Sequence, residues 1–202
     1  MMPVQSIVLV AVLCGAVLVA APVPVPAQRC GVSRWPVKIW SDLTADSVRA
    51  DSVVSTSIAA LRAMPRPTGR FEQRVRRGPI EHTVYRVRAR LAQVLTEDDS
   101  DVHLILRDPE DPSLTLVAEI PDSVCALTSR AASAFAEARR QLRRMPRGGL
   151  VEVEGIGFFD FLHGQRGMAP SGLELHPVLS LRPLRSEGSD AAPPSTVRRA
   201  PR

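Results

Sequence analysis

The sequence predicts a small, mostly β domain with one main helix. Two stretches, His82–Val94 and Val102–Arg107, alternate apolar and polar residues as half-buried strands do. The turn-forming run DPEDPS separates the second of these from a third strand, expected at Thr115–Ile120. An amphipathic stretch at Ser129–Met145 carries one apolar stripe, which predicts the helix.

Two more strands are expected after this helix, at Leu150–Ile156 and Leu173–Leu181. Pro146 and the Gly148–Gly149 pair end the helix before them. The order strand, strand, strand, helix, strand, strand resembles the OB-fold, a five-stranded Greek-key barrel. We therefore expect an OB-like barrel domain over residues 80–183. A different small barrel and the edge of a sandwich are the alternatives.

An export signal is predicted at residues 1–27. Ile7–Ala21 is an unbroken apolar run, shorter than the roughly 20 residues that a membrane-spanning helix needs. Small residues at Val25 and Ala27 predict cleavage before Gln28. We expect a secreted or periplasmic protein whose mature form has no stable membrane span, with an uncleaved N-terminal anchor as the alternative.

Irregular segments are expected on both sides of the barrel. Residues 28–79 form an arm, in which WPVKIW (35–40) is predicted to be extended and Ser55–Met64 to contain a short helix ended by prolines. The stretch Arg66–Gly78 is interpreted as a solvated basic linker. Residues 184–202 are polar and rich in proline, which predicts a disordered tail.

The cysteines predict one disulfide. Cleavage of the signal removes Cys14 and leaves Cys30 and Cys125. An even pair in an oxidising compartment is typical of a bridge, here between the arm and the region after the third strand. Two unlinked thiols are the alternative.

Four phrases in the sequence, RWPVK, EDDSDVHL, GFFDFLHGQ and ELHPVL, are similar to those of a family of uncharacterised bacterial secreted proteins. The resemblance implies that the chain contains a genuine domain. It implies no activity.

A polar constellation falls within the predicted barrel. If the second and third strands form a hairpin about Asp111, His103 lies directly opposite Glu119, close enough for an imidazole–carboxylate contact. Because Leu104 and Leu106 form the core face, we expect both side chains to point outward. The candidate site residues are Asp101, His103, Glu119, Asp160, His163, Gln165, Glu174 and His176.

A metal-dependent secreted hydrolase is one interpretation of this constellation. Imidazole and carboxylate groups suit zinc or another divalent ion, which activates water. The candidate ligands are His103, Glu119, His163 and His176. Staphylococcal-type nucleases are secreted OB-fold enzymes, an analogy that rests on fold alone. The alternative is that these histidines are structural, and no other cofactor is predicted.

A binding module is the function that we expect first. The formal net charge of +5 favours an anionic partner, such as a glycan, a nucleic acid or a protein. The second–third strand face and the loop Gly157–Gly172 would bind it, with loop phenylalanines 158, 159 and 161 as stacking platforms. The basic face consists of Arg86, Arg88, Arg90 and Arg107. Alternatively, the phenylalanines plug the barrel end, the arginines are merely solvated, and the chain is a structural envelope protein.

Overall fold

The computed structural model describes residues 30–31, 33–96 and 100–185. The predicted signal peptide, its cleavage point and nearly all of the predicted tail lie outside these residues. The elements in chain order are α1 (Trp35–Lys38), η1 (Ala45–Ser47), β1 (Arg49–Thr56), α2 (Ile58–Ala63), η2 (Ile80–His82), β2 (Thr83–Thr96), β3 (Val102–Arg107), β4 (Thr115–Ile120), α3 (Ala132–Leu142), β5 (Leu150–Phe159) and β6 (Leu173–Pro183).

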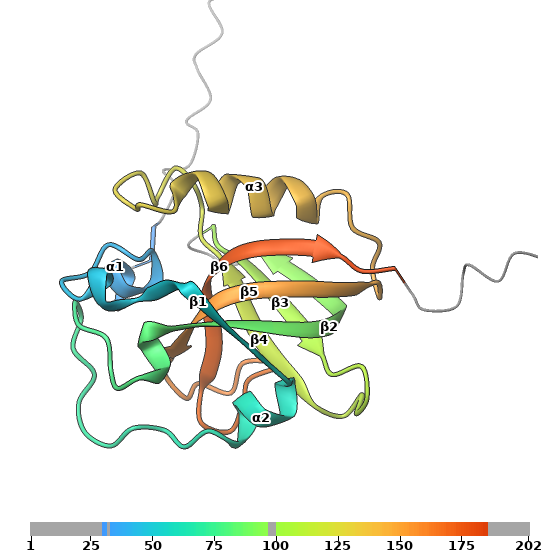
Figure 1. Ribbon diagram of the computed structural model, residues 1–202, viewed down its shortest axis with the longest axis horizontal. Helices are drawn as coiled ribbons and strands as arrows, with labels where there is room; N and C mark the ends of the chain where they lie inside the picture. The colour runs from blue at the N-terminus through green and yellow to red at the C-terminus, as the bar shows by residue number, and fades with distance from the viewer. Residues whose placement is uncertain (1–29, 32, 97–99, 186–202) are drawn as a thin grey trace, which may run out of the picture.

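Strands β2 to β6 form a closed five-stranded barrel (Figure 1). The long β2 pairs antiparallel with β3 through one part of its length and with β5 through another. The barrel closes where β4 lies parallel to β6, at Ala118 and Leu175. The predicted fold class, a mostly β protein with an OB-like barrel and one main helix, is confirmed.

The β3–β4 hairpin has the register that the sequence predicts. His103 pairs with Glu119, Ile105 with Val117 and Arg107 with Thr115. The bounds of both strands also agree with the prediction. This agreement follows from the position of the turn, because its centre fixes every pair in a two-stranded ladder.

The core fills the barrel and the space beneath α3. Leu104, Leu106 and Leu116 are fully buried within it. Helix α3 is shorter than predicted and contributes Phe135 and Ala138, which are also buried. In Figure 1 this helix lies along the side of the barrel next to β6.

The arm is more ordered than the sequence predicts. Residues 35–38 form the short helix α1 instead of an extended stretch, because Pro36 has a backbone angle suited to the first turn of a helix. Strand β1, which was not predicted, pairs parallel with the first part of β2. The predicted short helix is present as α2, with Ser57 as its N-cap.

The predicted basic linker is only partly solvated. The Arg76 guanidinium is buried, lies 3.0 Å from Asp42 Oδ2 and donates to the carbonyl oxygens of Val37 and Glu81. A buried cation with a carboxylate and two carbonyl partners keeps its segment against the barrel. The linker therefore packs as part of the domain.

The predicted disulfide is confirmed. Cys30 and Cys125 are bonded, with a Cα–Cα distance of 5.5 Å and a sequence separation of 95. The bridge joins the start of the described chain to the segment between β4 and α3. None of the helices within the described residues combines the length and apolar composition required to span a bilayer.

Candidate functional site

The strands bring most of the predicted polar residues together. Asp101 precedes β3 and His103 lies within it, while Glu119 lies near the end of β4. The parallel pairing of β4 with β6 places Glu174 and His176 beside Glu119. We call the following residues the polar cluster: Lys38, Asp101, His103, Glu119, Asp160, Glu174 and His176.

Glu119 bridges the two histidines of the cluster. Its Oε1 lies 3.0 Å from His103 Nδ1, and its Oε2 lies 3.0 Å from His176 Nδ1. Glu174 Oε1 lies 3.2 Å from the same His176 nitrogen. Three strands are thereby joined through charged side chains.

Asp101 completes the cluster on the other side of the His176 ring. Its Oδ1 accepts a hydrogen bond from the backbone N–H of Asp122 at 2.9 Å. Its Oδ2 lies 3.6 Å from His176 Nε2, which makes no hydrogen bond within the described residues. Both side chains are fully buried.

The outer side of the β3–β4 hairpin, toward which His103 and Glu119 point, is not open to solvent. They lie on the face opposite Leu104, as predicted, but only 1% of His103 and 5% of Glu119 is exposed. The connection between β5 and β6 covers them, with the Gln165 amide 2.9 Å from His103 Nδ1. A Cβ at Gly167 would lie 3.0 Å from the Ile105 side chain, which shows how closely this connection packs.

His163 does not join the cluster's interior. Its side chain is 51% exposed, and its Nε2 lies 3.6 Å from Asp160 Oδ2. Asp160 in turn lies 3.6 Å from Lys38 Nζ. His163 is therefore at the solvent edge, while the other candidate ligands lie inside.

Sequence reasoning missed Lys38, which α1 places against the cluster. Its ammonium lies 5.5 Å from the centre of the Phe158 ring. Burial opposes its charge, but the carboxylates of Glu174, Glu119, Asp160 and Asp101 outweigh burial and raise its pKa. The available signal was that the only lysine of the chain stands within the apolar run WPVKIW.

The cluster perturbs its own titrating groups. Burial lowers the pKa of His176, but the charge of Glu119 and hydrogen bonds to Glu119 and Glu174 raise it to about 9. Burial opposes ionisation of Glu119, yet its pKa is lowered by His176, by the hydrogen bond to His103 and by Lys38. Burial, together with repulsion from Glu119, raises the pKa of Glu174 to about 7. The cluster therefore favours the ionised form of Glu119.

The predicted basic face is present on β2 and β3. Arg86 is paired with Glu154, at 2.7 Å, and with Glu152 of β5. Arg88, Arg90 and Arg107 are exposed. Arg90 of β2 lies directly opposite Arg107 of β3 in the antiparallel ladder. The charge of Arg86 is thus compensated within the sheet.

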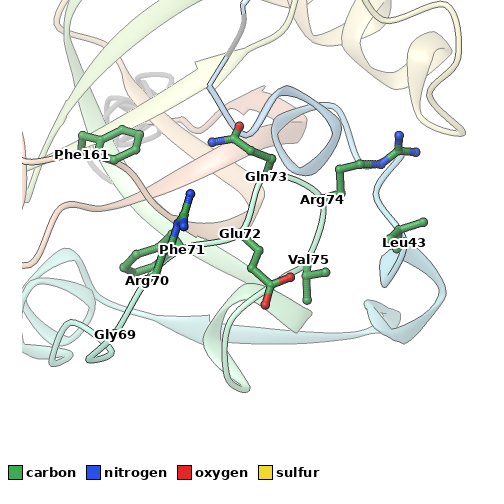
Figure 2. Close-up of a pocket in the computed structure, with 9 residues that line it drawn as sticks. All are labelled: Leu43, Gly69, Arg70, Phe71, Glu72, Gln73, Arg74, Val75 and Phe161. Atoms are coloured by element: carbon green, nitrogen blue, oxygen red, sulfur yellow. The ribbon is translucent and has the colours of Figure 1, made fainter.

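The arm and the connection after β5 form an open groove of about 950 Å³ (Figure 2). Its lining residues are Leu43, Gly69, Arg70, Phe71, Glu72, Gln73, Arg74, Val75 and Phe161. Phe161 comes from the connection after β5 and is 49% exposed. Phe158 and Phe159, which were expected in that loop, belong to β5 and are buried, so they have no face available for stacking on a ligand.

Arg34 fixes the wall of this groove. Its guanidinium lies 2.7 Å from both carboxylate oxygens of Glu81 and donates to the carbonyl oxygens of Glu72 and Val75. Its backbone N–H donates to the Gln73 side chain at 2.7 Å. A fully buried arginine therefore sets the path of residues 72–75.

No protein-family model matches the chain, and no curated protein matches it. Among solved structures, it is similar to Entamoeba histolytica asparaginyl-tRNA synthetase in complex with asparaginyl-adenylate (TM-score 0.38, 12% identity, 66% of this chain and 24% of that one). It is also similar to a protein assigned as an aspartyl-tRNA synthetase from Leishmania major Friedlin (TM-score 0.36, 14% identity, 65% and 21%). The chain spans less than a quarter of the length of either protein, and likeness at this level carries no argument about function.

Proposed function

We propose that this chain is an exported OB-fold-like binding module that takes an anionic ligand in the groove between residues 69–75 and Phe161. The observation that carries the proposal is the half-exposed Phe161 ring, presented beside the arginine-bearing wall of a 950 Å³ groove. An aromatic ring beside cationic side chains is the combination that binds flat, negatively charged groups.

This assignment refines the surface expected from the sequence. The connection after β5 remains the ligand-binding loop of the proposal, but only its Phe161 has an exposed ring. The outer face of β3 and β4 is covered by the same connection, so it offers a ligand little surface. The groove adds Arg70 and Arg74, both exposed, to the proposed binding residues.

A hydrolase is less well supported than a binding module. A catalytic metal keeps one coordination position open to water or substrate. Of the four predicted ligands, the side chains of His103, Glu119 and His176 are 1%, 6% and 0% exposed, and His163, at 51%, lies at the solvent edge. A substrate would have to displace the covering connection before it reached them.

Export remains part of the proposal. It is supported by the apolar segment Ile7–Ala21 and by the small residues before Gln28. The Cys30–Cys125 bridge is consistent with an oxidising compartment, since stable disulfides form mainly there.

The test is binding of two anionic probes. Binding of a labelled single-stranded DNA oligonucleotide is measured by fluorescence anisotropy, and binding of heparin is measured by its competition with a labelled probe. Phe161→Ala is compared with Leu162→Ala, which removes a neighbouring apolar side chain that is 57% exposed, against 49% for Phe161, and does not line the groove. Loss of one stacking contact is worth about 1–3 kcal/mol, so Phe161→Ala should weaken oligonucleotide binding about 5- to 150-fold.

Arg74→Ala should weaken both probes and flatten the dependence of affinity on salt, because it removes one phosphate or sulfate contact. Stronger loss with the oligonucleotide than with heparin in Phe161→Ala would identify a base-stacking ligand. The proposal fails if neither probe binds, if binding does not weaken between about 50 and 200 mM salt, or if the two apolar variants behave alike. Absence of binding would favour a structural envelope role.

A further inference from the structure

We propose that Asp101, Glu119 and His176 bind a divalent metal ion inside the polar cluster. The chemistry of these donors indicates that the ion is zinc. This site is separate from the groove and independent of the proposed function. Each of the three residues offers a ligand atom, and these atoms all lie within 4.8 Å of one another. They come from the segment before β3, from β4 and from β6.

The separation of Asp101 and His176 supports an ion between them. Asp101 Oδ2 and His176 Nε2 are 3.6 Å apart, too far for a good hydrogen bond. Two ligands at about 2.0–2.2 Å from one zinc ion in tetrahedral geometry lie roughly 3.3–3.6 Å apart, which matches this pair. Glu119, whose Oε2 lies 3.0 Å from His176 Nδ1, would turn one oxygen from that nitrogen toward the ion. His176 Nε2 is fully buried and makes no hydrogen bond within the described residues. Among the described residues its charged neighbour is Asp101 Oδ2, and an ion between the two would replace this long contact by two metal bonds.

The contacts around the three residues orient them as metal ligands are usually oriented. Histidine ligands typically use their second ring nitrogen to bond a carboxylate, and His176 Nδ1 lies 3.0 Å from Glu119 Oε2 and 3.2 Å from Glu174 Oε1. Glu174 would keep this role when Glu119 binds the ion. His103 lies 3.0 Å from Glu119 Oε1. The Asp122 N–H holds Asp101 Oδ1, which turns Oδ2 toward His176.

The charges of the cluster also favour a bound cation. Four carboxylates, those of Asp101, Glu119, Asp160 and Glu174, surround a single lysine and two imidazoles. Lys38 Nζ lies 3.6 Å from Asp160, at the edge of the cluster next to His163.

The donor set indicates which ion binds and what it does. One imidazole with two carboxylates suits zinc better than calcium or magnesium, which prefer oxygen ligands alone. Because the three side chains are almost completely buried, the ion would be structural. It would hold the β4–β6 junction, where the barrel closes.

The experiment measures zinc and cobalt binding to the purified, disulfide-bonded protein after treatment with EDTA. His176→Asn keeps a hydrogen-bonding group near the Nδ1 position for Glu119 and Glu174 but removes Nε2. His163→Asn is the matched control, because His163 is a histidine at the exposed edge of the cluster. Wild type and His163→Asn should each bind a single zinc ion, with a rise in melting temperature. His176→Asn should bind at least about 10-fold more weakly while its far-ultraviolet circular dichroism stays that of a folded protein.

X-ray absorption of the zinc-loaded wild type provides a readout that does not depend on folding of a variant. A nitrogen and oxygen shell with imidazole scattering supports the site. The proposal is overturned if the folded wild type binds no zinc and shows no melting shift. It is equally overturned if His176→Asn binds zinc as the control does, or if the bound ion has no imidazole ligand.

Discussion

Replacing Arg34 by methionine should destabilise the whole domain, because this buried guanidinium holds the arm against the barrel. Arg34 is 1% exposed and lies 2.7 Å from both oxygens of Glu81, which is fully buried. Removing one partner of a buried ion pair costs about 3–5 kcal/mol, since the other charge remains without compensation.

The loss at Arg34 should lie toward the upper end of this range. The side chain also donates to the carbonyl oxygens of Glu72, Val75 and Phe159, and each buried acceptor left without a donor costs about 1 kcal/mol or more. Glu81 would retain the N–H groups of Arg77 and Phe159 as donors, which limits the loss. Against a total stability of about 5–15 kcal/mol for a domain, Arg34→Met should bring the protein close to unfolding.

Urea denaturation followed by the fluorescence of Trp35 and Trp40 measures this free energy, because both tryptophans follow the arginine closely in sequence. A double-mutant cycle with Glu81→Gln then isolates the pair. The double variant should lose less than the two single variants together, since the uncompensated charge is gone. A loss below about 1 kcal/mol for Arg34→Met, or simple additivity in the cycle, would refute the reasoning.

Two further predictions concern the bridge and the only tyrosine. The variant Cys30→Ala/Cys125→Ala should lose up to about 4–5 kcal/mol, the chain-entropy value for a loop of this size, and reduction of the wild type should match it in urea denaturation. Burial raises the pKa of Tyr85 above its ordinary value of 10.0, so the absorbance of tyrosinate should appear at higher pH in the folded protein than in urea. Because the unfolded state ionises first, this residue should lower stability as pH rises through 10; equal midpoints in the two states would contradict its burial.

The barrel was predictable because its signals are local. Alternation marks β3 and β4, and the turn between them fixes their register, so the His103–Glu119 pair could be named in advance. Strand β1 could not be found in this way. Its sequence RADSVVST is largely exposed and has no alternating burial, and it forms a strand because β2 provides a partner.

The candidate site was predictable only in part, for the same reason. Sequence periodicity assigns His103 to the face opposite Leu104 but contains no information about the connection that later covers that face. Lys38 lies far from the cluster in sequence and reaches it through α1. Arg76 belongs to a stretch of basic residues that resembles a solvated linker, and only the fold supplies Asp42 as its partner.

The Cys30–Cys125 bridge also determines how the domain would respond to mechanical tension. A force applied at Cys30 and Arg185 would pass through the sulfur–sulfur bond, so the loop that the bridge closes, with strands β1 to β4, could not be extended. Only α3, β5 and β6 could be drawn out, over roughly 60 residues or about 200 Å of contour length. After reduction of the bridge, strands β1 to β4 could be extended as well. The length to which the molecule can be stretched therefore depends on the oxidation state of its surroundings.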